Sequence, residues 1–181
     1  MKRLALALAL LVAPMAGAAE RHVPPGQGSL ASAIAGAAPG DVLVLTDGAY
    51  TGPVTIDRPL TVTGPRGAIV DGTGLGTVVT ISASDVRLAG FTVTGSGGVN
   101  QKLDAGVKIL KGADRAVVEN LLLQDNMHGI DVHGSRDARV ANNEIIGRQR
   151  ARMNERGNGI YVWNSPGTVV EGNSVRFGRD G

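Results

Sequence analysis

The sequence predicts an all-β protein in which short strands wind into the stacked coils of a single-stranded parallel β-helix. Three segments, which start at Gly106, Gly129 and Gly159, each continue with an apolar, a polar and an apolar residue. Repeats of 20 to 30 residues are typical of solenoids, and this alternation is typical of strands rather than helices. Leucine-rich repeats have a similar period, but the leucine consensus that they need is absent.

Stacked coils place equivalent residues directly above one another, about 4.8 Å apart. Because strand side chains alternate between two faces, the apolar residues of each repeat should point into the solenoid and the polar ones outward. The expected inward columns are Val107–Ile130–Ile160, Ile109–Val132–Val162, Val118–Val140–Val170 and Leu123–Ile145–Val175. Asn143 and Asn173 occupy the same place in neighbouring coils, so we expect their amides to form hydrogen bonds along the stack.

Residues 1–19 have the parts of a secretory signal sequence: a basic start, a short apolar run and small residues for cleavage after Ala18 or Ala19. The apolar run is shorter than the roughly 20 residues that cross a bilayer. We therefore expect the remaining chain, 20–181, to be exported to the periplasm and to have no membrane span of its own.

The exported chain is expected to form one β-helix domain over 20–181 that opens with a helix at about 29–38. Ser29 is the expected N-cap of this helix, and its apolar face would cover the strand edges at the start of the solenoid. Coils are expected over 41–181, with early strands at 42–45, 54–56, 60–62, 68–70, 78–81, 86–88 and 91–93. The chain stops where the next repeat should begin, so we expect an incomplete C-terminal end.

Composition excludes several classes of function. The chain has 18 Lys and Arg against 16 Asp and Glu, and removal of the signal with Lys2 and Arg3 leaves 16 against 16. A neutral exported chain gives no support to nucleic-acid binding. There is no cysteine, which excludes disulfides and thiolate metal ligands.

Two coils carry an insertion of seven or eight residues, at 95–104 and 147–156, and both insertions should project from the same edge of the solenoid. The second insertion contains one acidic residue and four arginines, namely Arg148, Arg150, Arg152 and Arg156. We predict a basic docking surface for an acidic protein partner or a polyanion. A solvated loop without a function is the alternative.

The polar residues of the repeats should form a second candidate surface on the outer wall. Lys108, Asp131 and Tyr161 are expected to stack there, with His133 and Trp163 beside them. Aromatic rings next to a carboxylate and a histidine suit a sugar ring or a protein contact. The alternative is that Trp163 packs under the adjacent loop and that His133 only faces water.

A weaker candidate is a metal site formed by Met127, His128, His133 and Met153. Without cysteine, only thioether and imidazole groups remain to hold a soft ion, so any metal bound here would be transient Cu(I). The spacing matches no zinc motif, which favours ordinary surface residues. We predict no intrinsic cofactor and no set of catalytic residues.

The run from Gly157 to Gly167, with Val170–Asn173 and Gly178–Gly181 after it, closely resembles the NosD family. The opening at 39–60 resembles the same family, whose fold is a right-handed parallel β-helix. The resemblance implies a periplasmic accessory protein for copper-centre maturation of nitrous oxide reductase. It implies three partners: the membrane subunit of an ABC-type transporter, a copper chaperone lipoprotein and the reductase. Members of the family are longer than this chain.

A carbohydrate-active enzyme is the rival hypothesis, because uronan lyases and epimerases share the fold. Asp131 to Gly134 faintly resembles the Asp-Pro-His-Asp run of mannuronan epimerases, with valine and glycine replacing two of the four residues. Asp131 and His133 would supply acid and base groups and Lys108 a cation, but no carboxylates cluster for calcium. A sugar-binding module that uses Tyr161 and Trp163 is a third possibility. We favour a non-catalytic scaffold.

Overall fold

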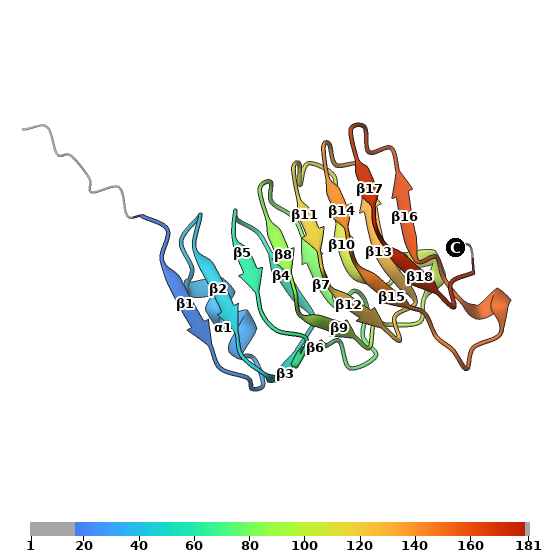
Figure 1. The fold of residues 1–181 in the computed structure, drawn as a ribbon, viewed down its shortest axis with the longest axis horizontal. Helices are drawn as coiled ribbons and strands as arrows, with labels where there is room; N and C mark the ends of the chain where they lie inside the picture. Colours follow the sequence, from blue (N-terminus) through green and yellow to red (C-terminus); the bar gives the residue numbers. More distant parts are fainter. Residues whose placement is uncertain (1–16, 180–181) are drawn as a thin grey trace, which may run out of the picture.

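The computed structural model describes residues 17–179, and this part of the chain is a right-handed parallel β-helix with short strands stacked along one axis (Figure 1). The fold class predicted from the repeats is therefore confirmed. Most of the expected signal sequence and the last two residues, 180–181, lie outside the described range.

Three parallel sheets form the walls of the solenoid, and coil after coil adds one strand to each sheet. The seven-stranded sheet contains β1 (Glu20–Val23), β2 (Val42–Leu45), β5 (Thr61–Thr63), β8 (Arg87–Ala89), β11 (Val117–Glu119), β14 (Arg139–Ala141) and β17 (Val169–Glu171). The six-stranded sheet contains β3 (Gly48–Thr51), β6 (Ala68–Asp71), β9 (Thr92–Thr94), β12 (Leu122–Gln124), β15 (Glu144–Ile146) and β18 (Ser174–Arg176). The five-stranded sheet contains β4 (Val54–Ile56), β7 (Val79–Ile81), β10 (Ala105–Ile109), β13 (His128–His133) and β16 (Ile160–Trp163).

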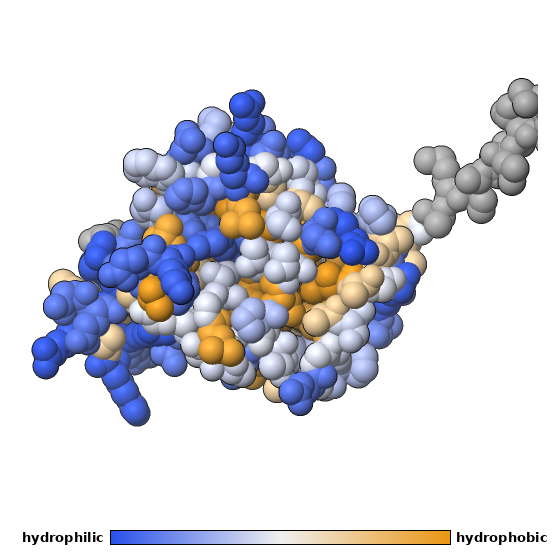
Figure 2. All heavy atoms as spheres, turned by 180° about the vertical axis from the view of Figure 1, so that it is seen from behind, coloured by the Kyte–Doolittle hydropathy of each residue, from blue (hydrophilic) through white to orange (hydrophobic). Residues whose placement is uncertain are grey.

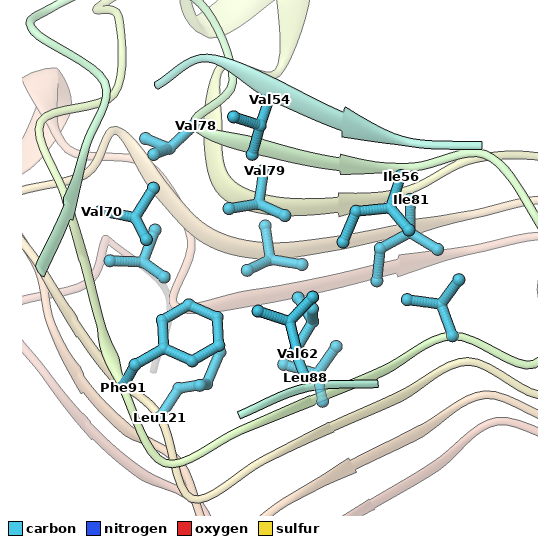
Figure 3. Close-up of a cluster of buried hydrophobic side chains, with 14 of the residues drawn as sticks. Val54, Ile56, Val62, Val70, Val78, Val79, Ile81, Leu88, Phe91 and Leu121 are labelled. Carbon is cyan, nitrogen blue, oxygen red and sulfur yellow. The ribbon is translucent and has the colours of Figure 1, made fainter. Parts of the chain in front are cut away.

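The strand register confirms all four predicted inward columns. Val107 pairs with Ile130 and Ile130 with Ile160, and the other three columns follow in the same way. The apolar side chains of the earlier coils also lie one above another, as Ile56 lies on Ile81 (Figure 3). Most of these side chains are fully buried, so the core is a narrow aliphatic column that runs along the helix axis.

The glycine that leads each repeat is required by close packing at a corner of the coil. A Cβ atom on Gly129 would lie 2.6 Å from Cγ2 of Ile145 and would also clash with the carbonyl oxygen of Gly159. A Cβ on Gly106 would lie 2.9 Å from Cδ2 of Leu123. Since real Cβ atoms do not approach other atoms so closely, only glycine allows β10, β13 and β16 to start at this position.

The helix α1 (Ser29–Gly36) covers the N-terminal end of the core. It buries Leu30 and Ile34 and contacts β1, β3 and β4, which belong to three different sheets. The predicted N-cap was wrong by one residue: Gly28, with a φ of 73°, caps the helix, and the hydroxyl of Ser29 donates instead to the carbonyl oxygen of Gly26. The sequence pattern did not show the position of the N-cap because Gly28 has no side chain that could form the usual capping hydrogen bond.

An asparagine ladder closes the turns beside the six-stranded sheet, as predicted. The Asn143 Nδ2 donates to Asn173 Oδ1 at 2.9 Å and to the carbonyl oxygen of Val118 at 2.9 Å. Its Oδ1 accepts from the backbone N–H of Leu121 at 3.0 Å. A single buried amide therefore joins three coils.

We expect Asn143→Leu to lower the free energy of unfolding by about 2 kcal/mol, because the backbone groups of Leu121 and Val118 lose their buried partner. Chemical denaturation of the variant would measure this change. Asn142→Leu is not a suitable control, since Asn142 has a positive φ of 56° that a leucine adopts poorly. Asp125→Asn, which alters an exposed turn residue, is the control. An Asn143→Leu variant as stable as the parent would contradict a structural role for the ladder.

Candidate functional site

The charges on two of the three outer walls are already paired with one another. On the seven-stranded sheet a ladder of ion pairs joins Arg87, Glu119, Arg139 and Glu171. On the six-stranded sheet Glu144 pairs with both Arg66 and Arg176. On these two walls, little unpaired charge is available to a ligand. The third wall is the five-stranded sheet.

Three polar side chains gather on the outer face of the five-stranded sheet. Lys108 of β10 and Asp131 of β13 are paired in register, and Lys108 Nζ lies 3.3 Å from Asp131 Oδ2. His133, two residues further along β13, places Nδ1 at 3.9 Å from Asp131 Oδ1. The structure thus brings together the residues that the sequence assigned to the outer column. We call Lys108, Asp131 and His133 the polar triad.

The expectation that Asp131 is an exposed surface residue was wrong. Its side chain is 0% exposed, and neither carboxylate oxygen accepts a hydrogen bond from any residue within 17–179. Strand alternation gives the direction of a side chain but not what covers it. Here Lys108 lies against the carboxylate, and its ammonium donates a hydrogen bond to the carbonyl oxygen of Lys102 at 2.9 Å.

Burial shifts the protonation of Asp131. Removal from water raises the pKa of the Asp131 carboxyl above its ordinary value, and the nearby charges of Lys108 and His133 oppose this rise only in part. A buried carboxylate without hydrogen bonds is unusual in proteins and calls for an explanation. Its basic neighbours are Lys108, at 3.3 Å, and His133, at 3.9 Å.

The polar triad borders a hollow of about 440 Å³ on the protein surface. Its lining consists of Leu103, Lys108, Leu110, Lys111, Asp131 and His133. The sequence reasoning missed Leu103 and Lys111. Leu103 belongs to the insertion at 95–104, and only the fold shows that this insertion, through η1 (Asn100–Lys102), borders the five-stranded sheet.

Tyr161 and Trp163 lie one coil further along the same face. Tyr161 pairs in register with Asp131, and Trp163 pairs with His133. Trp163 is 57% exposed, so the alternative in which it packs under the adjacent loop does not hold among the described residues. Tyr161 is only partly exposed.

The two insertions lie on the same edge of the solenoid, as predicted, and Arg148 of the second insertion contacts both the first insertion and the coil between them. The Arg148 guanidinium donates to the carbonyl oxygens of Ser96 at 2.8 Å and Gly97 at 2.9 Å, in the first insertion. It also approaches the sulfur of Met127 at 3.9 Å, in the intervening coil. Arg148 therefore links neighbouring coils, and its guanidinium is used within the fold.

Arg156 is also used internally. Its guanidinium donates to the carbonyl oxygens of Ala151 and Gln149 and lies over the ring of Phe177, 5.7 Å from the centroid. These bonds close the second insertion on itself around η2 (Met153–Glu155). The Arg156 guanidinium, like that of Arg148, thus has contacts within the fold, whereas those of the other two arginines of the insertion do not show such contacts among the described residues.

Arg150 and Arg152 remain as exposed cations on the second insertion, and neither forms an ion pair with another residue in the described part of the chain. The loop that carries them projects from the side of the solenoid (Figure 1), and Figure 2 shows a hydrophilic projection at the same end of the molecule. We call residues 149–155 the arm. Its two free arginines are the part of the predicted basic surface that stays available.

The four candidate metal ligands do not form a group. His128 and His133 occupy the two ends of β13, about 16 Å apart at the usual rise per strand residue. Met127 is buried beside Arg148, whereas Met153 is 68% exposed on the arm. No three His, Asp or Glu side chains in the range 17–179 gather in a way that would hold a metal ion.

Both ring nitrogens of His128 are already bonded. Nδ1 accepts from the backbone N–H of Asn158 at 3.1 Å, so Nε2 carries the hydrogen that Asn100 Oδ1 accepts at 2.8 Å. Burial lowers the pKa of His128, and the nearby charges of Arg179 and Lys108 lower it further. His128 therefore joins the first insertion, through Asn100, to the segment that follows the second insertion, through Asn158.

The stacked coils define a parallel β-helix protein, and the hollow lies on one of its outer walls. Comparison with curated proteins finds that part of the chain is similar to proteins named NosD. It is 37% identical over 137 residues to the "Probable ABC transporter binding protein NosD" of Stutzerimonas stutzeri, and the match covers 76% of this chain and 31% of the relative. The protein of the same name from Pseudomonas aeruginosa is 33% identical over 137 residues, covering 76% of this chain and 32% of the relative. The chain thus spans about a third of the length of these relatives.

Solved structures support the fold. A PL6 family alginate lyase, AlyGC, matches with a TM-score of 0.58 at 21% identity, over 71% of this chain and 20% of the lyase. A pectin methylesterase in complex with a hexasaccharide matches with a TM-score of 0.51 at 20% identity, over 81% of this chain and 60% of the esterase. No protein-family model matches the chain. At these identities the two structural neighbours show a shared β-helix fold alone.

Within residues 17–179, no helix has the length and apolar character needed to span a bilayer.

Proposed function

We propose that the chain is a periplasmic accessory protein for copper-centre maturation of nitrous oxide reductase. In this role it acts as a non-catalytic binding scaffold together with an ABC-type transporter and a copper chaperone lipoprotein. The homology to NosD carries the proposal, since the curated relatives are named as binding proteins of an ABC transporter. A stiff solenoid with an exposed arm suits a scaffold, because rigid coils hold a docking loop in a fixed position.

The proposal does not require the chain to hold copper in a site of its own. The candidate donors Met127, His128, His133 and Met153 are dispersed, and both nitrogens of His128 are occupied. Any Cu(I) contact would therefore be transient and would involve a partner's ligands as well. Export by the signal sequence at 1–19 would place the scaffold in the periplasm.

A deletion experiment tests the proposed function. In a denitrifying bacterium that carries the gene, its removal should leave the reductase polypeptide present but deficient in copper, and plasmid-borne expression should restore the metal. The measurements are reductase copper content by elemental analysis and nitrous oxide reduction. A fully metallated, active reductase in the deletion strain would defeat the proposal.

We predict that reversing the two free charges of the arm, with Arg150→Glu and Arg152→Glu together, weakens partner binding and leaves the fold intact. Both side chains are exposed, so their surroundings need not rearrange. For a charged contact at the edge of an interface, the main effect should be slower association, of about tenfold at low salt. Surface plasmon resonance with purified transporter complex or reductase would measure it.

Arg66→Glu with Arg176→Glu makes the same change in charge on the six-stranded wall and is the control for net charge. Equal association rates for the arm variant and the parent would exclude the arm as the docking element.

A further inference from the structure

We propose that the hollow beside the polar triad binds a uronate sugar, with Lys108 holding the carboxylate of the sugar and His133 accepting a hydrogen bond from a neighbouring hydroxyl group. The inference goes beyond the scaffold function and does not depend on it. It starts from the outer wall of the five-stranded sheet, where the Lys108–Asp131 ion pair borders a hollow together with the exposed Lys111.

The volume and lining of the hollow fit a small polar ligand with apolar edges. Its volume of about 440 Å³ lies within the range of about 300–1,000 Å³ that is usual for small-molecule sites. Leu103 and Leu110 supply apolar walls, and the methylene stems of Lys108 and Lys111 add to them. Such walls suit the C–H faces of a sugar ring better than a flexible, fully charged chain.

The charged side chains around the hollow favour a ligand with a carboxylate group. Lys108 and Lys111 bring two cations to the hollow, while its one carboxylate, Asp131, is 0% exposed. An ammonium group has three hydrogens. One of them is donated to Lys102, and another faces Asp131 Oδ2 at 3.3 Å. The third is left to bind a carboxylate from outside.

Asp131 is the positioning residue of this site. It is buried, lacks hydrogen bonds from the described residues, and lies within 4 Å of both Lys108 Nζ and His133 Nδ1. Asp131 therefore lies beside both side chains that the proposal assigns to the ligand. A uronate carries the two groups that this arrangement would bind: a carboxylate, and hydroxyls that donate.

Isothermal titration calorimetry with the exported chain and trigalacturonate tests the proposal. The methyl ester of the same trisaccharide is the matched ligand, since it differs only in its carboxylate charges, and tetraglutamate is the acidic peptide. We expect saturable binding of trigalacturonate at one site, with binding of the ester weaker by about tenfold or more. Equal binding of ester and acid, no saturable binding of the acid, or tighter binding of the peptide would overturn the proposal.

Substitutions of Lys108 and Asp131 test whether the ligand binds in the hollow. Lys108→Met combined with Asp131→Leu removes both partners of the ion pair, so that no lone charge stays buried and the fold should persist. We expect this double variant to lose trigalacturonate binding at least tenfold, about the effect of one charged contact. Arg150→Met, on the arm, should bind as the parent does. Unchanged affinity in a folded double variant, checked by circular dichroism, would also overturn the assignment. The copper content of the reductase is a separate measurement, so the scaffold function and the uronate site are tested independently of each other.

Discussion

Replacement of Ile130 by aspartate is expected to unfold the solenoid. Ile130 is fully buried at the centre of a column, between Val107 and Ile160, and no cation lies in that column to pair with a new carboxylate. Burial of an unpaired charge costs several kcal/mol even after the charge is neutralised by a shift in pKa. Total stabilities of domains are about 5–15 kcal/mol, so a cost of about 4 kcal/mol removes a large part of the whole.

The measurement is the unfolding midpoint in urea together with the β-sheet signal in circular dichroism. Ile69→Asp is the matched control: it makes the same substitution in a strand, β6, at an outward-facing position where the side chain is 36% exposed. We expect the Ile69 variant to remain folded with a change in stability below about 1 kcal/mol. Equal stabilities for the two variants would mean that the inward columns are not the core.

The second large effect is expected from Lys108→Met. This variant leaves Asp131 buried without its cation, and loss of one partner from a buried ion pair costs about 3–5 kcal/mol. Lys108 is 16% exposed, so water replaces the lost ammonium only in part. The double variant Lys108→Met/Asp131→Leu should recover most of the lost stability, because it buries no charge.

The destabilisation of Lys108→Met should depend on pH in a defined direction. The pKa of Asp131 is already raised by burial, and loss of Lys108 removes an interaction that lowers it. A folded-state pKa above the unfolded value means that the folded protein takes up protons as the pH falls toward the unfolded pKa. Its stability therefore increases on acidification through that window.

We thus expect the gap in unfolding free energy between Lys108→Met and the parent to be largest at neutral pH and to shrink toward pH 4. Urea unfolding at a series of pH values would measure it. A gap that stays constant with pH would show that the variant loses packing by the lysine stem rather than an ion-pair partner. A control with Lys111→Met, whose side chain is exposed, should show no such trend.

The coils could be predicted from the sequence because the spacing of the repeats in a parallel solenoid tells which residues stack on one another. Residues at the same place in each repeat become vertical neighbours, so the columns through Ile130 and Val140 and the ladder of Asn143 and Asn173 could be predicted from spacing alone. The resemblance to NosD was readable for a similar reason, since the run from Gly157 contains turn and strand residues in a fixed order.

The burial and the charge pairing of the polar residues could be read only from the tertiary structure. Alternation placed Asp131 on the outer face, but only the fold shows that its side chain is buried, between Lys108 of the previous coil and Tyr161 of the next. Arg148 and Arg150 look alike in the sequence, yet one reaches carbonyl groups of another insertion and the other faces water. Strand spacing fixes the direction of a side chain, whereas its charge pairing and exposure depend on neighbours distant in the chain, which the fold alone brings together.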